Sequence, residues 1–215
     1  MSCSTPSSGP SGVEAPAAAV SRRRLGAALA AALAWDLFGF DALARAAPVA
    51  SPLLPPRWLA RRLPGCTLAG QGWFRWWGFE VYRACLWVGP RGLDPVHLGS
   101  LPFALELRYA HGLSGHAIAD EAARLMAELE LGSARQRGQW LQSMRTSFPD
   151  VRAGDRLAGL YRDDPPRTGF WFDGTRVGGI AGRAFAEAFF GIWLSPRTPA
   201  LALRHALIAG LEPVR

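Results

Sequence analysis

The sequence contains no lysine: all 24 basic residues are arginine, against 17 acidic residues, and the formal net charge is +7. The arginines are spread along the chain without long runs, whereas a nucleic-acid interface appears in sequence as a basic cluster or stripe. The charge pattern therefore argues against nucleic-acid binding. Arginine is, however, the basic residue best suited to forked recognition of a carboxylate.

Motifs for metals, cofactors and common catalytic centres are also missing. The chain has only three cysteines and four histidines, and none of them pair at ligand spacing on one predicted element, so no metal site is expected. No G-x-S-x-G motif occurs, and the glycine spacings do not form a phosphate-binding loop, so no cofactor is implied. No stable membrane span is expected in the mature chain.

Residues 1–46 have the composition of an extension that precedes the fold. Residues 1–20 are small, polar and rich in proline, and we expect them to be disordered. Arg22–Arg24 then precede a short apolar run, Leu25–Trp35, and an A-x-A site that ends at Ala46. This order is typical of an export signal, and the paired arginines favour the twin-arginine route. We expect cleavage near Ala46 and a periplasmic or otherwise exported protein.

An uncleaved anchor and an ordinary amphipathic helix are the alternatives for this segment, and the apolar run is shorter than the roughly 20 residues that span a bilayer. The rest of the chain predicts one domain. Residues 47–63 are rich in proline and predict an irregular lead-in, and residues 64–211 predict the folded domain.

Periodicity in the remaining chain predicts an α+β fold, with an antiparallel sheet covered by a layer of helices. Alternation along 101–110 places Phe103, Leu105, Leu107 and Tyr109 on one face of a strand and Glu106 and Arg108 on the other. Asp173 and Gly174 are a strong hairpin signal. Further strands are predicted at 66–74, 79–88, 156–162 and 168–180, and helices at 115–131, 135–145, 181–194 and 198–210.

The first hairpin carries two features with open interpretations. A turn centred between Arg75 and Trp76 would place Cys66 opposite Cys85, which permits a disulfide in an oxidising compartment. A bulge near Gly70 would remove that register and leave two buried free thiols. Arg75, among four aromatic residues, either holds an anionic oxygen or is an exposed tip arginine resting on tryptophan faces.

The order of several segments resembles that of the bacterial chalcone isomerase-like proteins, over about residues 64–211. These segments are GQGWFRWWGFEVYRACLWV, LELRY, FPDVRAGDRL, GFWFDGTRVGGI and FAEAFFGIWLSPRTPALALRHALIAGL. The resemblance implies an open-faced β-sandwich with a ligand cleft between the sheet and the helices. Plant enzymes of this fold cyclise chalcones to flavanones, and related members bind fatty acids.

The family's functional positions carry over in part. In the enzymes, an arginine that follows a G-x-G turn steadies a phenolate. Arg75, which follows Gly70, Gln71 and Gly72, resembles that arginine. A threonine that polarises the ketone through water is matched by Tyr82. Arg108 is a further polar residue on a strand otherwise suited to burial.

The other catalytic positions of the family are replaced by apolar residues. A tyrosine and an asparagine fall near Ile118 and Leu125, and a second threonine falls at Ala188, which Phe189 follows. The resemblance therefore implies an apolar cleft with one charged end. Such a cleft suits a fatty acid or another small apolar carboxylate.

We therefore expect a noncatalytic binder of such a ligand. Two alternatives stay open: an isomerase or intramolecular lyase on an unknown substrate, and a structural periplasmic protein. The sequence names no oligomeric state.

Overall fold

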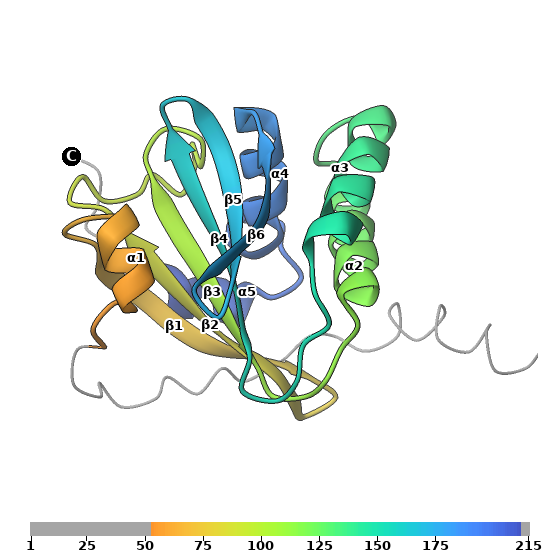
Figure 1. Ribbon diagram of the computed structural model, residues 1–215, viewed down its shortest axis with the longest axis horizontal. Coiled ribbons are helices and arrows are strands. Elements are labelled where there is room, and N and C mark those ends of the chain that lie inside the picture. Colours follow the sequence, from red (N-terminus) through yellow and green to blue (C-terminus); the bar gives the residue numbers. More distant parts are fainter. Residues whose placement is uncertain (1–52, 212–215) are drawn as a thin grey trace, which may run out of the picture. The chain divides into compact units, whose positions relative to one another are not determined.

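The computed structural model describes residues 53–211, so the predictions for residues 1–46 lie outside the described part of the chain. Figure 1 shows the elements in chain order: α1 (Arg57–Arg62), β1 (Thr67–Trp76), β2 (Phe79–Val88), β3 (Phe103–Tyr109), α2 (Gly115–Glu128), α3 (Ala134–Ser147), β4 (Arg156–Asp163), β5 (Pro166–Phe172), β6 (Thr175–Ala181), α4 (Arg183–Leu194) and α5 (Leu201–Ile208).

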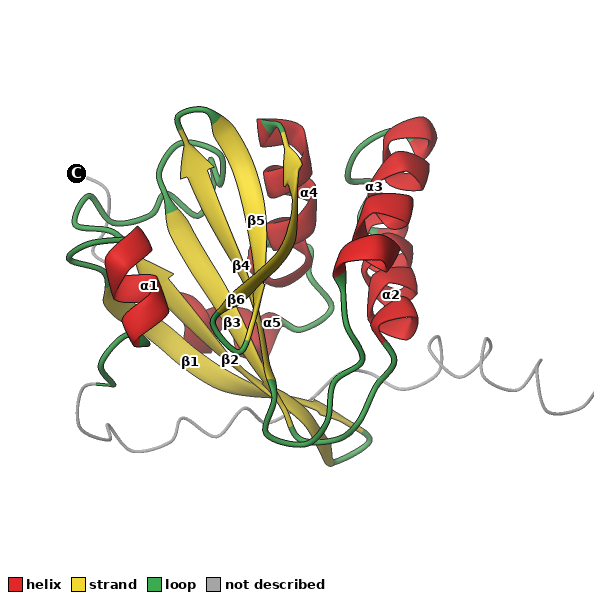
Figure 2. Ribbon diagram, viewed as in Figure 1, coloured by secondary structure: helices red, strands yellow, loops and turns green. Residues whose placement is uncertain are grey.

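The strands form one antiparallel sheet in which each strand pairs with the next along the chain, in the order β1 to β6. Figure 2 shows α4 between the strands and the α2–α3 pair, and α5 packs on β1 and β2. The predicted α+β fold with an antiparallel sheet and a layer of helices is confirmed. No helix within residues 53–211 has the length and apolar character needed to cross a bilayer.

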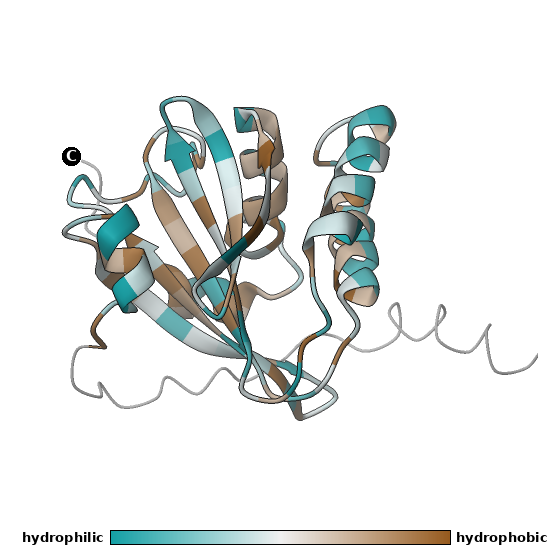
Figure 3. Ribbon diagram, viewed as in Figure 1, coloured by the Kyte–Doolittle hydropathy of each residue, from teal (hydrophilic) through white to brown (hydrophobic). Residues whose placement is uncertain are grey.

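Helix α4 forms the centre of the main hydrophobic core. Nine of its residues are buried, from Phe185 to Leu194, because it packs against the sheet on one side and against α2 on the other. In Figure 3 it is apolar along most of its length, whereas α2 and α3 each carry a polar side. A helix that is apolar all round must be enclosed by neighbouring elements. The run from Ala188 to Leu194 is therefore core, while Glu187 stays exposed.

Helix α1 corrects the prediction of an irregular lead-in at residues 47–63. Proline is compatible with a helix start, and Pro56 stands immediately before the first helical residue. The helix is held by packing: Leu59 is fully buried, and the ring of Trp58 stacks on Trp171 at 5.4 Å. These contacts form a second, smaller core on the sheet face opposite α4.

The register of the first hairpin differs from the symmetric turn expected at Arg75 and Trp76. The turn lies at Trp77 and Gly78, which have φ values of +52° and +80°. Cys85 pairs with Gln71 between the register shifts at Phe74/Arg75 and Leu68/Gly70, and Cys66 precedes the last pair of the hairpin, Thr67 with Val88. Cys66 and Cys85 are both free thiols. Of the two alternatives, the structure has the bulge and the unpaired cysteines.

Gly70 and Gly72 lie within strand β1, where the family resemblance implied a G-x-G turn. They allow α5 to lie directly on the strand: a Cβ atom at Gly70 would be 2.1 Å from the carbonyl oxygen of Ala206. The amide of Gly210 also donates a hydrogen bond to the carbonyl oxygen of Ala69, at 2.8 Å. The glycines therefore serve helix packing.

The face opposite α4 also buries a carboxyl group. Glu106 is 7% exposed, and its Oε2 atom has no hydrogen-bond partner within the described residues. Burial is the main cause that raises the pKa of Glu106, and the charge of Asp173 raises it further, whereas Arg156 and Arg108 lower it. The net effect is a carboxyl group that keeps its proton to a higher pH than usual.

We predict that Gly70→Ala destabilises the protein by at least about 1–3 kcal/mol, because the new methyl group displaces the last turn of α5. Gly138→Ala is the matched control, since Gly138 lies in α3 with no other group within 4 Å of the added carbon. The control should gain up to about 1 kcal/mol from helix propensity. Urea denaturation measures the free energy of unfolding of both variants. If Gly70→Ala were as stable as the parent, the close approach of α5 to β1 at Gly70 would be contradicted.

We also predict that Glu106→Gln raises the free energy of unfolding near neutral pH. The folded protein holds the Glu106 proton to a higher pH than the unfolded chain does, so its stability falls as pH rises above the usual carboxyl pKa. The variant has no such proton, and its advantage should disappear towards about pH 4. Exposed Glu130→Gln is the control, expected within about 0.5 kcal/mol at every pH. If the free energy of unfolding of Glu106→Gln differed from that of the parent by the same amount at every pH, the raised pKa of Glu106 would be contradicted.

Candidate functional site

Tyr82 lies on the helix-layer face of the sheet, near the turn of the first hairpin at Trp77 and Gly78. It stands opposite Phe74 on β1 and Tyr109 on β3. Its ring stacks on Phe74 at 5.1 Å and meets Tyr109 edge-on at 5.9 Å. Its hydroxyl oxygen accepts a hydrogen bond of 2.9 Å from the indole nitrogen of Trp193 on α4. This hydrogen bond joins the sheet to the central helix.

The two tyrosine hydroxyls are the polar groups of this apolar region. Burial raises the pKa of Tyr82 well above its usual value, and the charge of Glu121 adds to the effect, although the bond from Trp193 opposes it. Burial also raises the pKa of Tyr109, which is only 3% exposed. Within residues 53–211, neither hydroxyl donates its proton to an acceptor. Both are therefore neutral donors that a ligand oxygen can use.

Helix α2 covers this region. Ser114 caps it by accepting a hydrogen bond from the amide of Ala117 at 3.1 Å. The charge of Glu121 raises the pKa of Tyr82, so Glu121 lies near that side chain. Ile118 and Leu125 lie one turn before and one turn after Glu121, on the same face of the helix. Both side chains are partly buried and pack on the main core. Tyr82, Ile118 and Leu125 thus all pack on the main core, and their shared role in ligand binding stays a prediction.

Ala188 and Phe189 belong to α4, and the structure separates their roles. Ala188 is buried in the core, where it leaves room for neighbouring elements. Phe189 is the centre of an aromatic cluster that extends to Trp193, whose ring lies 5.4 Å away. Trp193 is one helical turn beyond Phe189, and that spacing alone could have identified it as part of the site. The sequence analysis missed it, and it missed Tyr109 as a site residue.

Arg75 lies on the other side of β1. Phe74 faces the helix layer, and adjacent strand residues point to opposite faces. The Arg75 guanidinium forms an ion pair with Glu80 at 2.6 Å, and the two side chains are 33% and 42% exposed. Arg75 therefore lies near the hairpin turn, paired with the Glu80 carboxylate, on the face of the sheet opposite Tyr82.

Arg108 also lies on the face opposite the helix layer. Its neighbours in the strand, Leu107 and Tyr109, are in the main core, whereas Arg108 is exposed. Directly opposite it are Arg83 on β2 and Arg156 on β4. The predicted site residues therefore divide between two faces: Tyr82, Ile118, Leu125, Ala188 and Phe189 on the helix-layer side, and Arg75 and Arg108 on the other.

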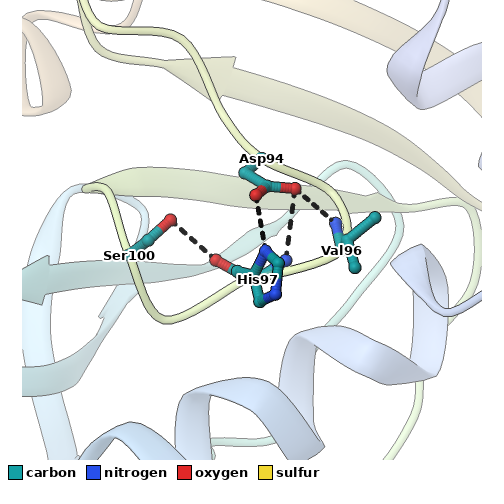
Figure 4. A network of polar contacts seen from close by, with 4 residues as sticks. All are labelled: Asp94, Val96, His97 and Ser100. Carbon is teal, nitrogen blue, oxygen red and sulfur yellow. Dashed lines mark hydrogen bonds and ion pairs between the residues drawn. The ribbon is translucent and has the colours of Figure 1, made fainter. Parts of the chain in front are cut away.

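The loop between β2 and β3 holds an Asp, a His and a Ser close together, as Figure 4 shows. Asp94 lies 2.7 Å from Nδ1 of His97, but the Ser100 hydroxyl donates to the backbone oxygen of His97 and not to its ring. The serine is therefore not activated as a nucleophile. These bonds shape a turn. Among the described residues no cluster of His, Cys, Asp or Glu is suited to hold a metal ion.

Comparison with known proteins agrees with this architecture. A protein of Haemophilus influenzae described as uncharacterized is 26% identical over 139 residues, and the match spans 65% of this chain and 66%, just under two thirds, of that relative. Among solved structures, the Arabidopsis thaliana fatty-acid binding protein AtFAP1 superposes with a TM-score of 0.53 at 11% identity, over 67% of this chain and 87% of that chain. That likeness concerns the fold.

The family comparison covers most of the described residues. The sequence model of the chalcone isomerase-like family matches residues 65–209, nearly the same range as the segments that carried the resemblance. The predicted chalcone isomerase-like domain is thereby confirmed, and the chain belongs to the chalcone isomerase-like family.

Proposed function

We propose that this protein is a noncatalytic binder of a fatty acid or a similar apolar carboxylate. The observation that carries the proposal is the pair of neutral tyrosine hydroxyls, Tyr82 and Tyr109, at the end of an apolar region between the sheet and α2. Two donors without an acceptor suit the two oxygens of a carboxyl group. AtFAP1, which shares the fold, is a fatty-acid binding protein.

The apolar part of the ligand would lie along Ile118 and Leu125 of α2 and Phe189 of α4. Each buried methylene contributes about 0.8 kcal/mol, so a long chain supplies most of the affinity and the hydroxyls set its direction. The sequence suggested Arg75 as the group that holds the carboxylate. The ion pair with Glu80 and the opposite face of β1 favour Tyr82 in that role.

The same geometry disfavours the isomerase alternative. A general base must be within hydrogen-bond reach of its proton and have a pKa near the working pH. The two tyrosines have raised pKa values, so they stay protonated at neutral pH. Glu121, the carboxylate that faces Tyr82, is held by Arg124 at 2.6 Å. The arrangement supports binding.

Native mass spectrometry with lipid extraction, on the full chain purified from its host, tests this function. We expect a bound fatty acid in the parent, and we expect Tyr82→Phe to weaken palmitate binding about tenfold or more, as for the loss of a hydrogen bond to a charged group. Tyr161→Phe is the matched control, because its buried hydroxyl bonds to the carbonyl oxygen of Gly99, away from the site. The control should bind like the parent.

Arg75→Ala separates the two candidate anchors. If Tyr82 holds the carboxyl group, this variant should bind palmitate within about twofold of the parent, since a partly exposed ion pair contributes little. A large loss of palmitate affinity in Arg75→Ala would instead indicate that Arg75 binds the carboxylate. A parent protein that neither carries nor takes up a fatty acid would refute the proposal, and turnover of a chalcone would favour the isomerase. The intact mass also tests the predicted cleavage near Ala46.

A further inference from the structure

We infer that the tip of the first hairpin, together with a row of arginines beside it, docks on the surface of a bilayer that contains anionic phospholipid. This inference does not depend on the proposed ligand. The aromatic tip is defined here as Trp76, Trp77 and Phe79. The arginine row is Arg83, Arg108 and Arg156.

The aromatic tip is a concentrated apolar surface. Trp76, Trp77 and Phe79 are 44%, 62% and 71% exposed, and they are three of the eight large hydrophobic residues exposed within residues 53–211. Together with Gly78 they occupy four successive positions, and the other aromatic side chains of residues 53–211 are buried or partly buried. Exposed apolar side chains gathered in this way mark an interaction site. Tryptophan in particular prefers the boundary between water and lipid.

The fold holds these rings at one end of the sheet. Figure 1 shows the β1–β2 turn beyond the end of α2, beside the loop that follows β3. The amide of Ala110 donates to the carbonyl oxygen of Val81, which ties that loop to the tip. The ion pair between Arg75 and Glu80 links the two strands just before the turn. The tip is therefore a fixed projection that can enter a lipid head-group layer without rearrangement.

The arginine row supplies the charge. Arg83, Arg108 and Arg156 stand directly opposite one another across three neighbouring strands, and Trp73 stands opposite Arg83 at the edge of the row. Like charges in direct opposition destabilise a sheet. No carboxylate within residues 53–211 forms an ion pair with any of the three. An external anion would remove this repulsion.

The two features lie close together, because Trp73, which stands opposite Arg83, is only three residues from Trp76 in the tip. Aromatic rings followed by a cationic row match the order of layers in an anionic bilayer, where phosphates lie outside the acyl chains. A bilayer requires no matching shape, which suits a single narrow hairpin. A protein partner would need a larger complementary surface.

Vesicle sedimentation with the purified full chain tests the inference, using phosphatidylcholine vesicles with and without phosphatidylglycerol. The parent should bind the anionic vesicles more tightly than the neutral ones. The double variant Trp76→Ser, Phe79→Ser should lose at least about tenfold in binding to the anionic vesicles, because it removes two of the three rings. Val96→Ser, exposed in the loop after β2, is the apolar control and should bind like the parent.

The charge is tested separately. Arg108→Gln should weaken binding to anionic vesicles about fivefold and leave binding to neutral vesicles unchanged, as expected for one arginine near such a surface. Arg135→Gln, at an exposed position on α3, is the matched control and should have no effect. Thermal unfolding of each variant checks that the fold is intact. Quenching of tryptophan fluorescence by brominated lipid reports insertion of the tip tryptophans, Trp76 and Trp77, in the parent and in Arg108→Gln.

The inference fails if the parent binds neither type of vesicle, or if the tip variant binds as tightly as the parent while tryptophan fluorescence is unquenched. If the tip binds a protein and not a bilayer, the parent will bind neither type of vesicle. Vesicles without free fatty acid keep this measurement apart from ligand binding. If the proposed function fails and docking holds, palmitate uptake is absent while vesicle binding is intact.

Discussion

The close approach of α4 to the sheet is the contact on which the rest of this structure depends. Gly159 of β4 leaves room for it: a Cβ atom there would lie 3.1 Å from the Cζ atom of Phe190. On its other side, Gly191 of α4 faces Leu131, which follows α2. The helix is thus enclosed between the sheet and the α2–α3 pair, and its position brings Trp193 within bonding distance of Tyr82.

Two register shifts in the first hairpin decide which side chains share a face. One residue, Val81, is extra in β2 between the pairs Phe74–Tyr82 and Arg75–Glu80. Because of it, Arg75 pairs with Glu80 on the face away from the helices, while Tyr82 stays on the helix side. The shift between Leu68 and Gly70 lies on the far side of the Cys85–Gln71 pair, where the pairing continues as Leu68 with Trp87 and Thr67 with Val88. The two shifts therefore set the pairs near the polar end of the proposed site and leave Gln71 opposite Cys85.

The sequence predicts the fold far better than it predicts the site. Alternation placed Leu105 and Tyr109 on the buried face of β3 correctly, and the helix predicted from residue 115 begins where α2 begins, because these signals depend on local periodicity. Bulges have no comparable signal, so the pairing of Arg75 with Glu80 could not be deduced. Helix α1 was missed because it is short and is stabilised by Trp58 and Leu59 packing on a distant strand. Trp193 alone among the missed residues had a usable spacing signal.

The separation of charge between the two faces bears on how the proposed ligand is held. An arginine buried between the sheet and α2 would lose its hydration and would need a permanent counter-charge. The tyrosine hydroxyls lose far less on burial, and Trp193 already satisfies one lone pair of Tyr82. A neutral pair can hold a carboxyl group whether it is ionised or protonated, so an empty site carries no uncompensated charge. The arginines on the opposite face remain in water, where an anionic surface can reach them.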